Sequence, residues 1–196
     1  MGFVLRNKAT LVRYKKTKRH RNFLIIEKNE NPQSTVIVIM KNPSTTCINM
    51  QNGKRNLCTY AKKAKCRIDR TTGKVYRLLT KKGYDRIVVL NLFSLYETYT
   101  TEVNLYYNGV NSSPDLLKNS DNAINQILKK YPTAPIVCAW GGNSKIDPTF
   151  YQTRIRHVLS ILQGRSLNKY CTVHKAICSY DPKLHGLYPP HGLMWK

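Results

Sequence analysis

The sequence predicts an α/β fold: a three-layer αβα sandwich with a central, mostly parallel sheet of about four strands. Runs of β-branched and apolar residues recur along the chain, and such runs are typical of strands buried on both faces. Two stretches with a helical stripe of apolar residues lie among them, and this alternation favours a parallel sheet with helices on both sides. The chain has 196 residues, enough for one domain with its own core. We expect a basic N-terminal arm over residues 1–22 and a single domain over residues 23–196.

The first two predicted strands cover residues 23–27 and 35–40. The residues between them include Asn-Glu-Asn-Pro at 29–32, which is strong turn chemistry, so we expect the two strands to form a hairpin. The second strand must open into a loop at Pro43, because proline has no N–H to donate and biases Asn42 away from helix. Ligands bind at this end of the strands in open α/β sheets, so the loop is a candidate site, with a plain turn as the alternative.

The middle of the chain contains a further strand and the first long helix. Residues 62–77 are basic and include a turn signal at Thr72-Gly73. Residues 87–91 predict a second buried strand that ends in an asparagine. Ser113 followed by Pro114 is typical of a helix start, and an apolar stripe at helical spacing follows it.

The last part of the chain repeats this alternation. Residues 136–140 predict a third buried strand, and Asp147 followed by Pro148 predicts the start of another helix. Residues 172–178 are expected to form a fourth strand, and the tail over residues 185–196 is expected to be a loop. Because the carboxyl ends of parallel strands share one rim, we expect the residues that end these strands to lie close together.

The chain is strongly basic. It contains 33 Lys and Arg against 10 Asp and Glu, and 33 − 10 gives a net charge of +23. A polyanion is therefore the expected partner: DNA, single-stranded or duplex, with RNA as the alternative. We expect no membrane association, because the sequence has neither an apolar run of about 18 residues nor a signal-peptide pattern. We also expect a monomer.

Basic residues are concentrated near the N-terminus, where residues 6–21 contain no acid. Like charges at this density favour an extended arm that contacts phosphates without reading sequence, and a solvated tail is the alternative. The candidate phosphate contacts are Lys15, Lys16, Lys18, Arg19 and Arg21.

The six cysteines include no Cys-x-x-Cys pair, and a chain of this size is stable without disulfides. We therefore expect reduced cysteines and a cytoplasmic, nucleoid-associated protein. A zinc site formed by Cys171, His174 and Cys178 is a weaker alternative, because the spacing fits no usual pattern. No metal ion or other cofactor is expected.

Four short motifs stand at the predicted strand ends and in the tail. In chain order they are Asn42-Pro43-Ser44, Leu90-Asn91-Leu92, Ala139-Trp140-Gly141 and His191-Gly192-Leu193. The set resembles the uracil-DNA glycosylase superfamily. Over most of residues 20–196 the chain is also similar to an uncharacterised bacterial family with Asn-Pro-Ser-Thr, Asn-Leu-Phe, Ala-Trp-Gly and a C-terminal His-Pro-Leu-Tyr. The chain departs from both patterns at Gly192, where each has proline. The resemblance implies a uracil-DNA glycosylase-like fold.

The resemblance also implies a role for each residue. Asn42 would position the attacking water, Asn91 would read the edge of uracil through its amide, and His191 would stabilise the leaving base. Leu193 matches an apolar wedge that enters the base stack. The remaining substrate-binding candidates are Pro43, Ser44 and an aromatic that stacks on the flipped base, with Tyr60 as first choice and Tyr96 as second.

The leading hypothesis is a monofunctional uracil-DNA glycosylase that hydrolyses the N-glycosidic bond of a flipped uracil. A second His-Gly-Leu begins at His185, and we prefer His191 by its distance from the chain end. Asn42 carries an amide, which cannot be a strong base and so suggests slow chemistry. The alternatives are a catalytically weak or inactive nucleic-acid-binding protein of the same fold, and a hydrolase that acts on a nucleoside or a modified base.

Overall fold

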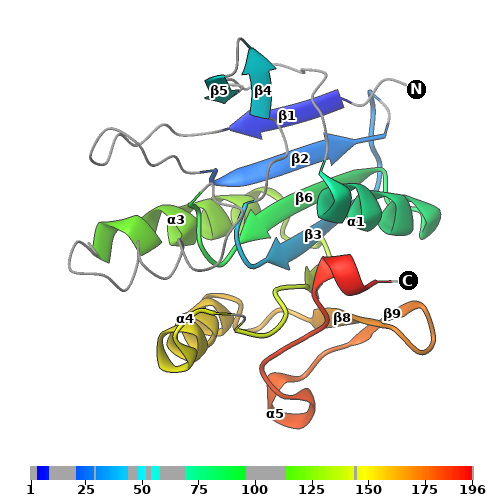
Figure 1. The fold of residues 1–196 in the computed structure, drawn as a ribbon. Coiled ribbons are helices and arrows are strands. Elements are labelled where there is room, and N and C mark those ends of the chain that lie inside the picture. Colours follow the sequence, from blue (N-terminus) through cyan, green and yellow to red (C-terminus); the bar gives the residue numbers. More distant parts are fainter. Residues whose placement is uncertain are drawn as a thin grey trace.

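The computed structural model describes residues 4–8, 21–28, 30–43, 48–51, 54–57, 69–95, 114–143 and 145–195. In these ranges seven strands form one sheet, two more form a small antiparallel pair, and helices cover both faces of the large sheet (Figure 1). The strands are β1 (Val4–Lys8), β2 (Phe23–Glu27), β3 (Thr35–Met40), β4 (Ile48–Gln51), β5 (Lys54–Leu57), β6 (Arg86–Asn91), β7 (Ile136–Cys138), β8 (Leu167–Cys171) and β9 (Ala176–Ser179). The helices are α1 (Arg70–Lys81), α3 (Pro114–Lys130), α4 (Pro148–Ile161), α5 (Pro182–His185) and the 3-10 helix η1 (Gly192–Met194).

β3 lies at the centre of the large sheet. The strand order is β1-β2-β6-β3-β7-β8-β9, and β3 pairs in parallel with β6 on one side and with β7 on the other. Its residues from Val36 to Met40 are all buried. A strand without a polar face needs neighbours at both edges and cover on both faces, and this central position provides both.

The sheet is mixed, and the expectation of a mostly parallel sheet with about four strands needs correction. The four central strands β6, β3, β7 and β8 are parallel, whereas β1, β2 and β9 run antiparallel to their neighbours. The predicted hairpin of β2 and β3 is wrong, because β6 lies between these strands and pairs with both. β6 carries its own apolar run over residues 87–90 and takes the buried place beside β3. Residues 4–8, which we expected in a loose arm, form the edge strand β1.

The turn predicted at Thr72-Gly73 is also wrong, because these residues lie inside α1. Asp69 caps this helix: its Oδ1 accepts hydrogen bonds from the backbone N–H groups of Thr71 and Thr72, at 2.8 and 3.0 Å. The buried residues Val75 and Leu79 recur at helical spacing and pack on the sheet. The cap and this apolar stripe outweigh the helix-breaking tendency of one glycine.

The predicted strand at residues 172–178 is confirmed only in its second half, because residues 172–175 form a turn and residues 176–178 belong to β9. β8 precedes the turn and β9 follows it, and they pair as an antiparallel hairpin. Cys171 and Cys178 form a disulfide across this hairpin, so the expectation of reduced cysteines is wrong for this pair and the alternative zinc site loses two ligands. Cys138 is a buried free thiol. Within the described ranges no cluster of three or more His, Cys, Asp or Glu could hold a metal ion.

The sheet separates two apolar cores. Alternate strand residues such as Ile37 and Ile39 face α3 and α4, while Val36 and Val38 face α1 and the C-terminal Trp195. The predicted helix starts are confirmed: α3 begins at Pro114, and Asp147 caps α4. No helix in the described part of the chain is long and apolar enough to cross a membrane.

Candidate active site

The carboxyl ends of β3, β6 and β7 lie side by side at one rim of the sheet. Beyond the strands the pairing continues: the Leu92 N–H donates to the Met40 carbonyl at 2.8 Å, and the Phe93 N–H donates to the Lys41 carbonyl at 3.0 Å. On the other side, the Ala139 N–H donates to the Ile39 carbonyl at 2.8 Å. These contacts bring three of the four motifs together at this rim, as their positions at strand ends predict.

Asn91 is the last residue of β6 and is 2% exposed. It pairs with Met40 in the parallel register and, by strand alternation, faces the α1 side of the sheet together with Val89. Its Oδ1 and Nδ2 are both buried, and neither has a hydrogen-bond partner among the described residues. Each buried polar atom without a partner lowers the stability of the fold by about 1–3 kcal/mol. Folded proteins keep such atoms mainly where a ligand, a water or a reaction uses them.

The end of β6 is fixed from the opposite face by α4. The buried Arg154 donates from Nε to the Leu92 carbonyl at 2.7 Å and forms an ion pair with Asp121 of α3 at 2.6 Å. Charge-assisted hydrogen bonds of this kind are geometrically strict, so the backbone that carries Asn91 is held rigidly.

Asn42 is half-buried in the loop after β3, and its Nδ2 donates to the Pro43 carbonyl at 3.2 Å. Pro43 is buried. Because this loop follows directly on β3, the Asn42 amide stands at the same rim as Asn91. Ser44 lies outside the described residues.

His191 is half-buried and caps η1. Its Nδ1 accepts a hydrogen bond from the Leu193 N–H at 3.2 Å, so the neutral ring carries its proton on Nε2 and can donate from there. Burial lowers the pKa of His191, and the nearby Lys41 lowers it further, while Asp69 acts in the opposite direction. The imidazole is therefore neutral near pH 7.

Close packing at two glycines fixes the position of His191. Gly141, at the end of β7, has φ +69°, and a Cβ there would lie 2.8 Å from the Cβ of His191. A Cβ on Gly192 would lie 2.7 Å from Cγ2 of Val75 in α1. The backbone of the C-terminal segment thus runs in close contact with both β7 and α1, which brings His191 to the rim.

The choice between the two histidines follows from their positions. His185 is exposed in α5, its Nδ1 accepts a hydrogen bond from the Asp181 N–H at 3.0 Å, and its ring stacks on Tyr180. Only His191 of the two touches Gly141 at the rim. Beside it, Leu193 is 38% exposed and Met194 is 62% exposed, so both offer apolar side chains at the surface.

Three residues that the sequence did not single out also gather here. Lys41 is 5% exposed, burial lowers its pKa to about 8, and its Nζ lies 5.3 Å from the ring centre of Tyr151. Tyr151 donates its hydroxyl hydrogen towards the carbonyls of Trp140 and Gly141, at 3.2 and 3.0 Å. The ring of Tyr188 stacks on Tyr151 at a centroid distance of 6.0 Å and is 41% exposed. The sequence offered one signal for Lys41, namely a lysine placed directly between a predicted buried strand and Asn42-Pro43.

Trp140 has a structural place, as expected, since it is fully buried and donates from Nε1 to the Leu187 carbonyl at 2.8 Å. Arg21 is only 1% exposed, so its proposed contact with phosphates needs correction. The side chain lies inside the fold, and the backbone N–H of Arg21 donates to the Ser94 carbonyl at 2.7 Å. The other candidates lie outside the described residues; they are Tyr60, Tyr96, Lys15, Lys16, Lys18 and Arg19.

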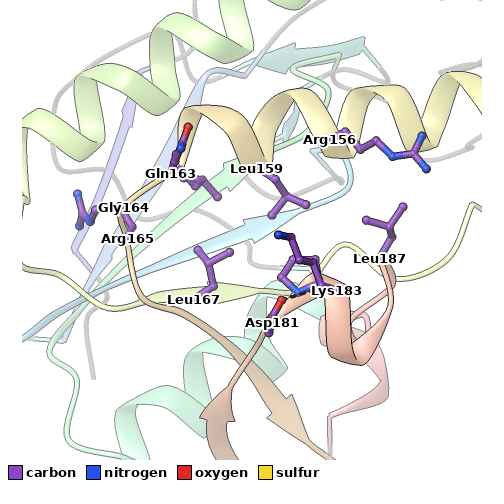
Figure 2. Close-up of a pocket in the computed structure, with 11 residues that line it drawn as sticks. Arg156, Leu159, Gln163, Gly164, Arg165, Leu167, Asp181, Lys183 and Leu187 are labelled. Atoms are coloured by element: carbon purple, nitrogen blue, oxygen red, sulfur yellow. Dashed lines mark hydrogen bonds between the residues drawn. The ribbon is translucent and has the colours of Figure 1, made fainter.

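A pocket of about 460 Å³ lies elsewhere, between α4, β8 and α5 (Figure 2). Leu159, Leu167 and Leu187 supply apolar surface, and Arg156 and Lys183 supply charged groups to its lining. None of Asn42, Asn91 and His191 lines it. This pocket is therefore separate from the rim at the strand ends.

Comparison with known proteins places most of the chain in one family. A family model described as "Protein of unknown function (DUF1643)" matches residues 21–180. No curated protein and no solved structure matches the chain. The matched range includes all three strand ends of the rim, whereas the basic residues before position 21 and the segment with His191 lie outside it.

Proposed function

The chain belongs to this family of unknown function, and we propose that it is a monofunctional DNA glycosylase, one that hydrolyses the bond between a flipped uracil and its deoxyribose. The observation that carries the proposal is the Asn91 amide, which is buried at the end of a central strand with its donor and its acceptor both unused. The motif order at the rim and the net charge of +23 support it.

The unused amide has the hydrogen-bonding pattern that uracil requires. Asn91 can donate from Nδ2 to O4 of the base and accept at Oδ1 from N3–H. With the amide held in this orientation, cytosine, which presents an amino group and a bare ring nitrogen at the same positions, would meet a donor with a donor and an acceptor with an acceptor. A site built this way rejects the wrong base strongly, because its buried polar atoms then stay unpaired.

Hydrolysis leaves an oxocarbenium-like sugar and an anionic base, so the site has to place a water and stabilise negative charge. Asn42 is the residue that we assign to the water; its amide orients the water oxygen towards C1′ but cannot act as a strong base. His191 is neutral and has Nε2–H free for a base oxygen such as O2. Leu193 would fill the gap that the base leaves in the stack.

A flipped base also needs a surface to stack on. Tyr188 is half exposed beside the rim, and Gln152 donates to its hydroxyl at 3.2 Å, which helps to fix the ring. Stacking on such a ring contributes about 1–3 kcal/mol per base. The Asn91 amide is almost completely buried in this structure, so a base reaches it only after the side chains over it shift.

The proposal is tested with purified protein in excess over oligonucleotides that contain uracil in a single strand, opposite adenine or opposite guanine. Alkali then cleaves any abasic site. We expect strand breaks that decrease on the order of 10²-fold in Asn91→Val and His191→Ala, as for removal of one transition-state donor. Asn125→Ala, which changes an exposed asparagine of α3, is the control. Absence of breaks in every context rejects the glycosylase proposal.

A second function is a nucleic-acid-binding protein of the same fold that has lost its chemistry. Two observations favour this alternative: the Asn91 amide is buried beneath other side chains, and the composition is basic. It predicts tight, salt-sensitive binding to DNA or RNA without base release. Binding equal for uracil and thymine oligonucleotides, with no abasic product, would support it over the first proposal.

A further inference from the structure

Lys41 has no counterpart among the roles assigned above, yet it is the most deeply buried lysine of the described chain, with 5% exposure. An ammonium group in such a place ordinarily has a carboxylate beside it. None of the ion pairs between described residues includes Lys41. Within the described part of the chain its one close partner is the ring of Tyr151, and a cation–π contact compensates only part of the lost hydration.

The position of Lys41 relates it to the proposed chemistry. It lies between the end of β3 and Asn42, and its backbone carbonyl pairs with Phe93, two residues after Asn91. Its Nζ lies over the ring of Tyr151, the Tyr151 hydroxyl donates to the Gly141 carbonyl, and Gly141 packs against His191. This chain of contacts brings the Lys41 charge close to His191, the residue that faces the leaving base in the proposed reaction. An anion held by the Nε2–H of His191 would therefore lie within the field of the Lys41 ammonium, whose residue is 5% exposed.

We propose that the Lys41 ammonium is the positive charge that stabilises the base anion as it leaves. This inference rests on the proposed glycosylase function. In the reaction the C1′–N1 bond breaks and its electron pair stays on the base. Water adds to C1′ and releases one proton to solvent, and the base anion later takes up one proton from solvent. Lys41 keeps its proton throughout, and His191 donates a hydrogen bond as a neutral ring.

His191 and Lys41 would contribute different properties to the stabilisation of the base anion. A neutral imidazole can direct a hydrogen bond at one oxygen but brings no net charge. A buried lysine brings a full charge but little direction. Asp69 and Tyr151 are the other titratable groups that act on this pair. A second cation, Lys74 of α1, lies near the same segment, where its Nζ donates to the Leu193 carbonyl at 2.9 Å.

The first test compares leaving groups. The variants Lys41→Met and Lys41→Arg are assayed on oligonucleotides that contain uracil or 5-fluorouracil, whose anion is intrinsically more stable. We expect Lys41→Met to slow uracil release on the order of 10²-fold and 5-fluorouracil release much less, with partial recovery in Lys41→Arg. Lys118→Met, which removes an exposed lysine of α3, is the matched control. Equal losses on both bases, or a loss in DNA affinity alone, overturn the proposal and indicate a structural or phosphate-binding lysine.

The second test does not depend on catalysis. The pKa of Lys41 is followed by NMR in protein labelled with ¹³C at the lysine Cε, with Lys41→Met to assign the signal. Free 5-fluorouracil should raise this pKa, because an anion beside an ammonium favours its charged form, and inorganic phosphate at equal concentration should not. If wild type releases no base but the pKa rises, the glycosylase proposal fails and the anion site stands. An unchanged pKa with 5-fluorouracil overturns the assignment of Lys41 whatever the activity.

Discussion

At the scale of single residues, Asn91 and Lys41 are both buried in a manner that lowers stability. Asn91 has two unpaired polar atoms, and Lys41 has an ammonium without a carboxylate. Both stand at the ends of central strands, where the apolar packing around them is strong enough to hold them. Sites for ligands are the usual places where a fold keeps such groups.

Replacing the Asn91 amide should therefore separate stability from function. We expect Asn91→Val to raise the free energy of unfolding by about 1 kcal/mol, since two unpaired polar atoms disappear, while uracil release is lost. Urea denaturation measures the first quantity and the alkali assay the second. Asn168→Ala is the comparison, because the Asn168 amide does have a partner, the Ile136 carbonyl at 3.2 Å, and its loss should lower stability. A fall in stability in both variants would contradict the account of Asn91.

Lys41 should give stability a distinct dependence on pH. Its pKa falls from 10.5 in an unfolded chain to about 8 in the fold, so the unfolded state holds more protons between these values. The cost of burying the charge is complete below pH 8 and disappears as the pH rises towards 10.5. We expect Lys41→Met to be more stable than wild type at pH 7, by on the order of 1–2 kcal/mol after allowing for solvent screening. The difference should shrink in denaturation curves taken from pH 8 to 10; a constant difference would contradict the assigned pKa.

At the scale of helices and strands, the sequence predicts where an element begins and ends better than it predicts which strands pair. β2 and β3 begin and end where their apolar runs do, and Asp147 caps α4 as its sequence indicates. Pairing partners depend on which strands bury the most surface together, so the insertion of β6 between β2 and β3 was not predictable from the local turn.

Short sequence signals also gave wrong predictions of secondary structure where contacts with the rest of the fold determine the conformation. Gly73 suggested a turn, but the Asp69 cap and the packing of Val75 keep the segment helical. The same holds at the site: Asn42 and Asn91 could be identified from strand-end motifs, whereas Lys41 and Tyr188 matter through neighbours that no short motif encodes.

The junction of β7 with the C-terminal segment should be sensitive to one methyl group. Gly141→Ala places a Cβ 2.8 Å from His191 on a backbone with φ +69°, so we expect a loss of at least ~1 kcal/mol in stability and displacement of the imidazole. Gly142→Ala is the control, because a Cβ there meets no atom within 4 Å. Thermal unfolding and the NMR titration of His191 measure the two effects. Equal behaviour of the two variants would show that Gly141 does not position the histidine.

At the scale of the whole molecule, the net charge of +23 has no structural explanation within the sheet or its cores. Charges of one sign repel each other and lower the stability of a compact state, so such an excess points to a polyanionic partner. The densest basic segment precedes residue 21, where the family match begins. Under the proposed function, the family fold and the basic segment would contribute different parts of binding: base recognition at the rim, and affinity for phosphates from the segment.

This separation predicts how binding depends on salt. Each neutralised phosphate contributes about −0.9 to the slope of log K against log salt on duplex DNA. Changing Lys15, Lys16, Lys18 and Arg19 to Gln should therefore reduce the slope by about 2–4 and weaken binding equally on uracil and thymine oligonucleotides. The control changes four exposed lysines at the ends of α1 and α3, at positions 81, 82, 129 and 130, with the same loss of charge.

Fluorescence anisotropy between 50 and 200 mM salt, a range over which such contacts lose roughly 10³-fold in affinity, resolves the difference. If both sets reduce the slope equally, net charge alone drives association; if only the first does, the N-terminal segment contacts the phosphates.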